Sequence, residues 1–179
     1  MQALHFLTNV LLSLFSTLFL LRFYMQCCRV SFVGDLGRFI AATTNWAVTP
    51  LRRLFPPWRG IDWSCFLLVW LANTIFVHIW LPSGLIATNR ERLLPESLLQ
   101  GFISTAHYLI QLLIILIIVS VIMSWLRLYS PAYMALRETL SRLTQPLLAP
   151  IRRFIPPIAN IDLSPLVAIV LLQALSLLL

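Results

Sequence analysis

Of the 179 residues, 60% are hydrophobic and only 11% are charged, and the mean hydropathy is +0.90. These values exclude an ordinary soluble globular domain, in which roughly a quarter of the residues carry charge. Thirteen arginines, no lysine and six acidic residues give a net charge of +7. In a soluble protein this balance would suggest nucleic acid. In so apolar a chain we expect the arginines to set membrane topology, with no nucleic-acid partner.

Four apolar stretches approach the length of membrane-spanning helices, since about 20 apolar residues in a helix cross a hydrocarbon core of about 30 Å. They cover about residues 4–21, 63–81, 102–126 and 163–179. The sequence therefore predicts an all-α membrane protein with four transmembrane helices.

The arginines are unequally distributed between the connections of these helices. Eleven fall in the connections after the first and third apolar stretches: Arg22, Arg29, Arg38, Arg52, Arg53, Arg59, Arg127, Arg137, Arg142, Arg152 and Arg153. Only two fall in the connection over 81–98. By the positive-inside rule, the Arg-rich connections face the cytoplasm and both termini face outward. This predicts a multi-pass protein of the bacterial inner membrane, with periplasmic termini.

An internal repeat becomes visible when the chain is aligned with itself at an offset of 100 residues. Nine of the 21 pairs starting at 44 and 144 are identical, where about one is expected by chance; in the first copy these are Thr44, Pro50, Arg52, Arg53, Pro56, Pro57, Ile61, Asp62 and Ser64. This indicates duplication of a unit of helix, surface segment and helix. We expect parallel repeats at 1–98 and 99–179, because each has an even number of spans.

The surface segments, 29–60 and 130–160, each contain an amphipathic stretch. In the second unit an apolar face recurs at spacings of three and four, and Ser130 before Pro131 is a good helix start. The apolar residues of that face are Tyr133, Leu136, Leu140, Leu143 and Leu147. The first unit repeats the pattern more weakly with Leu36, Phe39, Ile40 and Trp46. Both stretches are expected to lie flat on the membrane.

Prolines flank both arginine pairs, and the sequence predicts a kinked turn there because proline breaks helices. The motif prolines are Pro50, Pro56, Pro57, Pro150, Pro156 and Pro157. Adjacent arginines cannot share one helix face, which suits one to a phospholipid phosphate and the other to a protein carboxylate. Asp62 and Asp162 are the expected carboxylates and also N-caps of the following helices. Two interpretations stay open: a topology anchor, or a binding site for anionic lipid headgroups or a protein partner formed by Arg52, Arg53, Asp62, Arg152, Arg153 and Asp162.

Catalytic chemistry has no motif in this sequence: we find no phosphate-binding loop, nucleophile elbow, carboxylate pair or metal-ligand cluster. We therefore expect that the protein is not an enzyme and that it has no cofactor or metal site. Asn73 and Gln111 could line an ion path between the repeats, but four helices would need a homo-oligomer to form a pore. His5, His78 and His107 all fall near the expected outward side, where they could converge on a metal or haem.

Two copies of P-x-R-R-x-x-P, each followed by I-D-x-S at the start of an apolar helix, resemble the YggT (YlmG) family of integral membrane proteins. The resemblance covers nearly the whole chain, including Leu21 to Gln26 and Met123 to Trp125. The chain departs from the family at Trp46, where the second unit has Pro146 and the family usually has proline.

The resemblance implies a role rather than a reaction. Bacterial members of the family are linked to osmotic or envelope stress and to cell-division genes, and plastid relatives to haem attachment in cytochrome assembly and to organelle division. We therefore expect a non-enzymatic inner-membrane scaffold or assembly factor. A channel or transporter component for osmotic ion flux and a haem-handling factor are the alternatives.

Overall fold

The computed structural model describes residues 2–32, 34–54, 60–80, 90–126, 129–154 and 162–179. These residues form six helices: α1 (Gln2–Cys27), α2 (Asp35–Leu54), α3 (Trp63–Trp80), α4 (Arg90–Trp125), α5 (Pro131–Phe154) and α6 (Ser164–Leu178). The order is apolar, amphipathic, apolar, and then the same again. The predicted all-α class is confirmed, and we refer to α1–α3 as the first unit and α4–α6 as the second unit.

The apolar helices differ in length from the predicted spans. α1 and the Leu94–Trp125 part of α4 are long and apolar enough to cross a membrane, whereas α3 and α6 are shorter apolar helices. The expected connection over 81–98 is partly wrong, because α4 is already helical from Arg90 and contains Pro95. Pro95 is the sixth residue of this helix, past the first four N–H groups that lack intrahelical partners, so it removes one backbone hydrogen bond near the start of α4.

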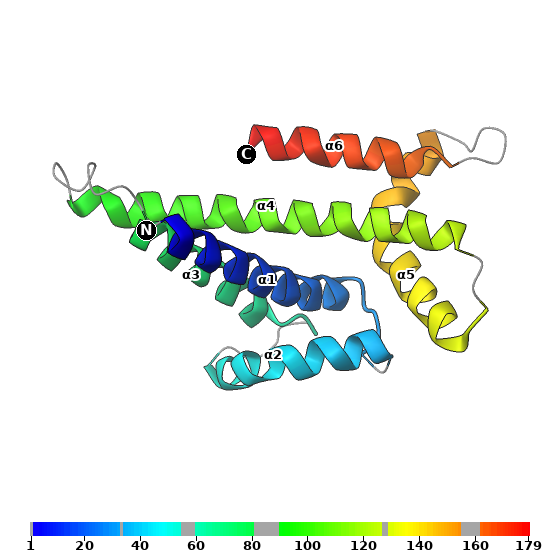
Figure 1. The fold of residues 1–179 in the computed structure, drawn as a ribbon, viewed down its shortest axis with the longest axis horizontal. Helices are drawn as coiled ribbons and strands as arrows, with labels where there is room; N and C mark the ends of the chain where they lie inside the picture. Colours follow the sequence, from blue (N-terminus) through cyan, green and yellow to red (C-terminus); the bar gives the residue numbers. More distant parts are fainter. Residues whose placement is uncertain (1, 33, 55–59, 81–89, 127–128, 155–161) are drawn as a thin grey trace.

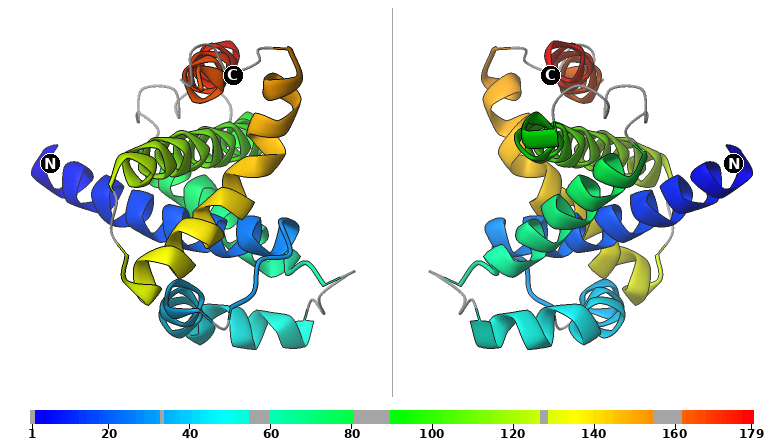
Figure 2. Two further views of the ribbon diagram at one scale, coloured as in Figure 1. Left: turned by 90° about the vertical axis from the view of Figure 1, so that its right-hand side faces the viewer. Right: turned by 90° about the vertical axis from the view of Figure 1, so that its left-hand side faces the viewer.

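The apolar helices pack side by side in two directions: α1 and α4 run one way, and α3 and α6 run the other way (Figure 1). The most extensive contact joins α3 to α4, and α1 packs against both of these helices. α6 lies along α4 on the side away from α1 and α3 (Figures 1 and 2). α4 is therefore the central helix, and α6 is covered on one side only.

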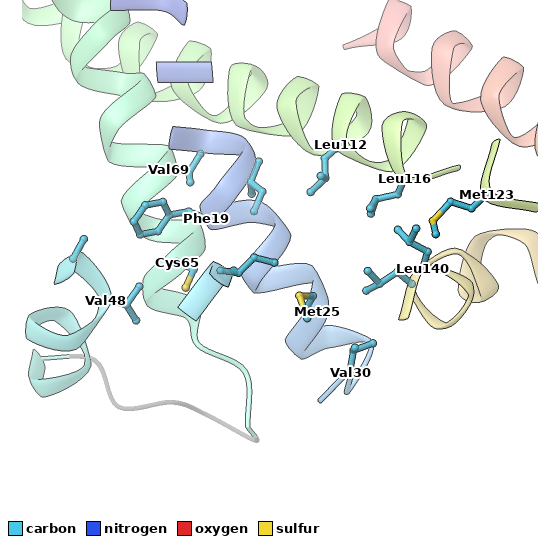
Figure 3. Packing of buried hydrophobic residues seen from close by; sticks show 14 of the residues in the cluster. Phe19, Met25, Val30, Val48, Cys65, Val69, Leu112, Leu116, Met123 and Leu140 are labelled. Atoms are coloured by element: carbon cyan, nitrogen blue, oxygen red, sulfur yellow. The ribbon is translucent and has the colours of Figure 1, made fainter. Parts of the chain in front are cut away.

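The main core gathers side chains from the first five helices (Figure 3). Phe19 of α1, Val48 of α2, Val69 of α3, Leu116 of α4 and Leu140 of α5 are all buried in it. A smaller cluster at Ile117, Leu148 and Ala168 joins α4, α5 and α6. Lipid is as apolar as leucine, so close packing and interhelical hydrogen bonds hold such helices together.

The amphipathic helix α5 follows its prediction. It begins at Pro131, and the N–H of Tyr133 donates to Ser130 Oγ at 3.2 Å, as expected for an N-cap. Tyr133, Leu140 and Leu143 are buried, and Leu147 is half-buried. Leu136 is the exception, because it lies at the exposed margin of this face.

Of the apolar face predicted for α2, two residues pack against the protein and two lie at its surface. Ile40 is buried and Leu36 half-buried, but Phe39 and Trp46 are 59% and 71% exposed. The buried face instead runs through Ile40, Thr44 and Val48, because Thr44 meets a side chain from α1 described below. Phe39 and Trp46 are seven residues apart, so they share one outward edge of the helix.

The kinked turns predicted at Pro50 and Pro150 are also wrong. Pro50 lies inside α2, and Pro146 and Pro150 lie inside α5. Each proline removes one backbone donor and frees the carbonyl four residues earlier. For Pro50 and Pro150 these carbonyls belong to Trp46 and Pro146, which are exposed residues at the surface of the protein. The helices therefore continue into the arginine pairs, while Pro56, Pro57, Pro156 and Pro157 lie outside the described residues.

Candidate functional site

In the first unit, the arginine pair lies in the last turn of α2 and Asp62 lies just before α3, and one of the arginines meets the aspartate. Arg52 Nη2 donates to Asp62 Oδ2 as an ion pair. The two sides of the pair differ in exposure, since the Asp62 side chain is 1% exposed and that of Arg52 is 43% exposed. The carboxylate is thus inside the protein, and the guanidinium covers it from outside.

A glutamine from α1 holds the same aspartate from the other side. Gln26 Nε2 donates to Asp62 Oδ2 at 2.7 Å, and the backbone N–H of Asp62 donates to Gln26 Oε1, also at 2.7 Å. One amide side chain therefore satisfies both a donor and an acceptor of Asp62. This links the end of α1 to the start of α3.

A buried arginine one turn before Gln26 joins α1 to α2. Arg22 is 4% exposed, and its Nη1 donates to Thr44 Oγ1 at 2.6 Å and to Asn45 Oδ1 at 2.9 Å. Its Nε has no hydrogen-bond partner among the described residues. Buried charges need such partners because their desolvation is costly. Arg22, Gln26 and Asp62 therefore form a polar brace across three helices, which we call the first-unit brace.

In the second unit the corresponding ion pair is open. Arg152 donates to Asp162 Oδ2 from Nε at 3.0 Å and from Nη2 at 2.7 Å, and the two side chains are 51% and 34% exposed. Asp162 Oδ1 accepts the backbone N–H of Ser164 at 3.0 Å. The pair therefore joins α5 to the first turn of α6, with no hydrogen bond to Asp162 from α4 among the described side chains.

The surroundings of Asp162 affect its pKa in opposing ways. Partial burial is the largest single influence and acts to raise it. The hydrogen bonds from Ser164 and the charge of Arg152 together outweigh burial, so the pKa of Asp162 lies below its usual value. The carboxylate is therefore ionised at neutral pH, which its pairing with Arg152 requires.

The second arginine of each pair points elsewhere. Arg53 and Arg153 are exposed, and neither has an ion pair or side-chain hydrogen bond to the residues that the structure describes. Arg53 lies seven residues after Trp46 and fourteen after Phe39, so it ends the exposed aromatic edge of α2. Arg153 is followed by the exposed Phe154. Each pair thus has one arginine bound to a carboxylate and one left available.

The sequence prediction for this site is confirmed in its main pairing and wrong in one detail. Arg52 pairs with Asp62, and Arg152 pairs with Asp162, as the charges and spacing predicted. Asp162 Oδ1 accepts the N–H of Ser164, but the N-cap residue of α6 is Leu163 and no side chain caps that helix; Asp62 does not cap α3 either. Its Oδ1 has no partner among the described residues, and its backbone carbonyl accepts the Cys65 N–H instead.

Sequence reasoning missed the buried residues of the first-unit brace. Arg22 was counted among the topology arginines of a connection, and the structure places it inside α1. Gln26 was noted only as part of the family resemblance. Their spacing of four residues after a long apolar run is the signal that could have found them, because it puts two polar groups on one face of the helix.

The other candidate residues do not assemble into a second site. Asn73 is buried and bonds to Ser16, Val69 and Thr105, whereas Gln111 is exposed on α4.

The histidines do not form a metal site among the described residues. His107 uses both ring nitrogens on backbone carbonyls, at Ile103 and Ser176, and His5 lies against the ring of Phe76. Within the part of the chain that the structure describes, no three His, Cys, Asp or Glu side chains are placed to hold a metal.

Together, the fold and the site define a class: an all-α protein with two long apolar helices, in which a helix–amphipathic helix–helix unit occurs twice, each time with an Arg–Asp link. The CCB3/YggT family model matches residues 1–81 and again residues 99–179. The chain therefore belongs to the CCB3/YggT family, and the match in two halves is what an internal repeat would give.

Relatives match over nearly the full length. The chain is 27% identical over 176 residues to "Uncharacterized protein YggT" of Escherichia coli K12, which covers 98% of this chain and 88% of that protein. It is 30% identical over 174 residues to "Uncharacterized protein in proC 3'region" of Vibrio alginolyticus, covering 97% and 91%. A Pseudomonas aeruginosa protein is 28% identical over 175 residues, covering 97% and 86%. No solved structure matches the chain.

Proposed function

We propose that this protein is a non-enzymatic scaffold or assembly factor of the bacterial inner membrane, with four spans and both arginine pairs at the cytoplasmic face. It would support tolerance of osmotic or envelope stress, or cell division. Family membership and the apolar helices support the location. The proposal rests on the different surroundings of the two arginines in each pair. Arg52 and Arg152 each bind an aspartate, whereas Arg53 and Arg153 are exposed without a partner among the described residues.

The ligand we propose for Arg53 and Arg153 is the phosphate of an anionic phospholipid. An exposed guanidinium presents a fork of donors that suits phosphate oxygens. Phe39 and Trp46 line the same edge of α2 as Arg53, and aromatic rings prefer the headgroup level of a membrane. Each basic residue close to an anionic surface contributes on the order of 1 kcal/mol to binding. The Arg–Asp link would keep the amphipathic helix in place while the neighbouring arginine binds lipid.

Photo-crosslinking in intact membranes tests this proposal. Thr49 and Ala149 are exposed and lie one turn before Arg53 and Arg153, so a photoreactive residue at either position would reach the same ligand. We expect an adduct with an anionic phospholipid. The matched control adds Arg53→Gln or Arg153→Gln, which should abolish the adduct at unchanged protein abundance. A dominant protein adduct, or a lipid adduct that is insensitive to the glutamine substitution, would refute lipid binding at these arginines.

Topology needs a separate experiment. A reporter that is active only in the periplasm should be active when it is fused after Leu179. Activity of a cytoplasm-specific reporter at that position would overturn the proposed orientation. It would also place both arginine pairs on the wrong side of the membrane for the proposed role.

A further inference from the structure

One edge of α3 makes much of the contact that joins the two units. Phe66 packs edge to face against Phe102 with ring centroids 6.2 Å apart, and Trp70 Nε1 donates to a backbone carbonyl of α4 at 3.1 Å. Further along, the buried Asn73 donates to Thr105 Oγ1 at 3.3 Å. These three α3 positions are four and three residues apart, so they form a single stripe on the helix.

The same stripe recurs on α6, where no helix covers it. The motif that precedes both helices repeats without a gap, from 61–64 to 161–164, which places the three α3 positions at Leu166, Val170 and Gln173. Leu166 and Val170 are 61% and 55% exposed, and Gln173 is exposed as well. The edge that packs α3 on α4 is therefore uncovered in its second copy.

Gln173 is the residue on this stripe that most needs a partner. It is a polar residue in a short apolar helix, and its side chain has no hydrogen bond to any residue in the described parts of the chain. Its counterpart Asn73 is bonded to side chains of two neighbouring helices, at Ser16 and Thr105. An unpaired amide in hydrocarbon is costly, and side chains of this type commonly bond between helices.

The complementary surface is present on α1. The family model matches residues 1–81 and again 99–179, so α1 stands in the first unit where α4 stands in the second. α1 carries four exposed leucines at spacings of three and four, which form one stripe: Leu4, Leu7, Leu11 and Leu14. α1 therefore presents an outward apolar stripe on the helix that corresponds to α4.

A groove lies where this second contact would form. It has a volume of about 370 Å³ and runs between α4 and α6. Leu166, Ile169 and Val170 line it from α6, and apolar residues including Ile118 and Val121 line it from α4. Within one chain, α4 packs against α1 and α3 of the first unit. These two helices correspond to α4 and α6, which form the walls of the groove.

We propose that α1 of a second copy of this chain packs into the α4–α6 groove, in the way that α4 packs against α1 and α3 within one chain. The occupant is a second copy because the covered contact and the uncovered surfaces are successive copies of one repeat. The interface is head-to-tail, so it leaves one α1 and one α6 free in a dimer, and it closes only as a ring. The inference goes beyond the proposed lipid binding and requires only that α1 and α6 lie in the same bilayer.

Disulfide crosslinking tests whether the stripe of α6 meets the leucine stripe of α1 in a second copy. Gln173 takes the place of Asn73 on α6, and Leu7 lies on the exposed leucine stripe of α1. In a background with Cys27, Cys28 and Cys65 replaced by alanine, the double variant Leu7→Cys, Gln173→Cys should form covalent dimers and larger species on mild oxidation in native membranes. α1 and α6 lie on opposite sides of α4, so a link within one chain is not expected (Figure 2).

The controls separate this geometry from its alternatives. Leu175 is exposed on the opposite side of α6, so Leu7→Cys with Leu175→Cys should give no dimer. Dimers from Gln173→Cys alone would mean a symmetric α6–α6 contact, and equal crosslinking of both pairs would mean random collision; either result overturns the proposal. The unaltered chain should also run as an oligomer in mild detergent by light scattering, and a monomer would overturn the proposal without any substitution.

Discussion

The two Arg–Asp links share a motif but differ in their surroundings. In the first unit, Asp62 is fully enclosed by Arg52 from α2 and Gln26 from α1. In the second unit, Asp162 is one-third exposed and binds only Arg152 and the first turn of α6. The difference arises outside the motif. In the first unit α1 contributes Gln26 to Asp62, whereas no described side chain of α4 donates a hydrogen bond to Asp162. The repeated motif therefore forms part of a buried brace in one copy and a partly exposed ion pair in the other.

Replacing each aspartate in turn should show the largest difference in stability between the two units. Asp62→Ala leaves Gln26 Nε2 and the Arg52 guanidinium without their shared acceptor, and we expect a loss of about 3 kcal/mol in the free energy of unfolding. Asp162→Ala removes a partly exposed ion pair and the acceptor of the Ser164 N–H, so we expect about 1 kcal/mol. Titration with a denaturing detergent from mixed micelles measures both. Equal losses in the two variants would show that burial of Asp62 does not matter.

Arg22 should give the next largest effect. Arg22→Met keeps much of the apolar stem but leaves the Thr44 and Asn45 oxygens without their donor, at a cost of about 2 kcal/mol. Arg142 is a matched control, since it makes an exposed pair with Glu138, and Arg142→Met should change stability by less than about 0.5 kcal/mol. If both variants lose the same small amount, Arg22 acts as a topology residue only.

Acid should affect the second unit through Asp162. Its pKa is lowered in the folded protein, so its contribution to stability is fully present above the ordinary value of 3.8 and is lost as pH falls through the lower folded value. Carboxyl-carbon NMR of labelled aspartate should show that the resonance lost in Asp162→Asn titrates below the ordinary value. A resonance for Asp162 at or above the ordinary value would contradict the role of the Arg152 and Ser164 contacts. The expected effect on stability is the smallest of the three, because the pair is partly exposed.

How far the sequence predicts this molecule can be judged from particular residues. The start of α5 at Pro131 and its periodicity as far as Leu147 follow from the sequence and from the Ser130 cap, and the two ion pairs follow from unlike charges at a repeated spacing. These are local features. The burial of Asp62 is not local, because it depends on Gln26 reaching across from a helix 36 residues earlier.

The errors have the same origin. Leu36, Phe39, Ile40 and Trp46 were predicted to form one apolar face, but the face of α2 that packs against α1 is the one that carries Thr44, because Arg22 binds it. Pro50 and Pro150 were expected to end their helices, but the carbonyls that they free lie on exposed residues, so the helices continue. In each case a tertiary contact or its absence overrides a local preference.

The account rests on the claim that Arg52 and Arg152 bind the protein while Arg53 and Arg153 bind anionic lipid. The most direct test counts phosphatidylglycerol molecules retained per chain after purification in mild detergent, for the single variants Arg52→Gln, Arg53→Gln, Arg152→Gln and Arg153→Gln. We predict that Arg53→Gln and Arg153→Gln each lose bound lipid while the other two retain it. Lipid loss in the Arg52 and Arg152 variants, with full retention in the Arg53 and Arg153 variants, would contradict the claim.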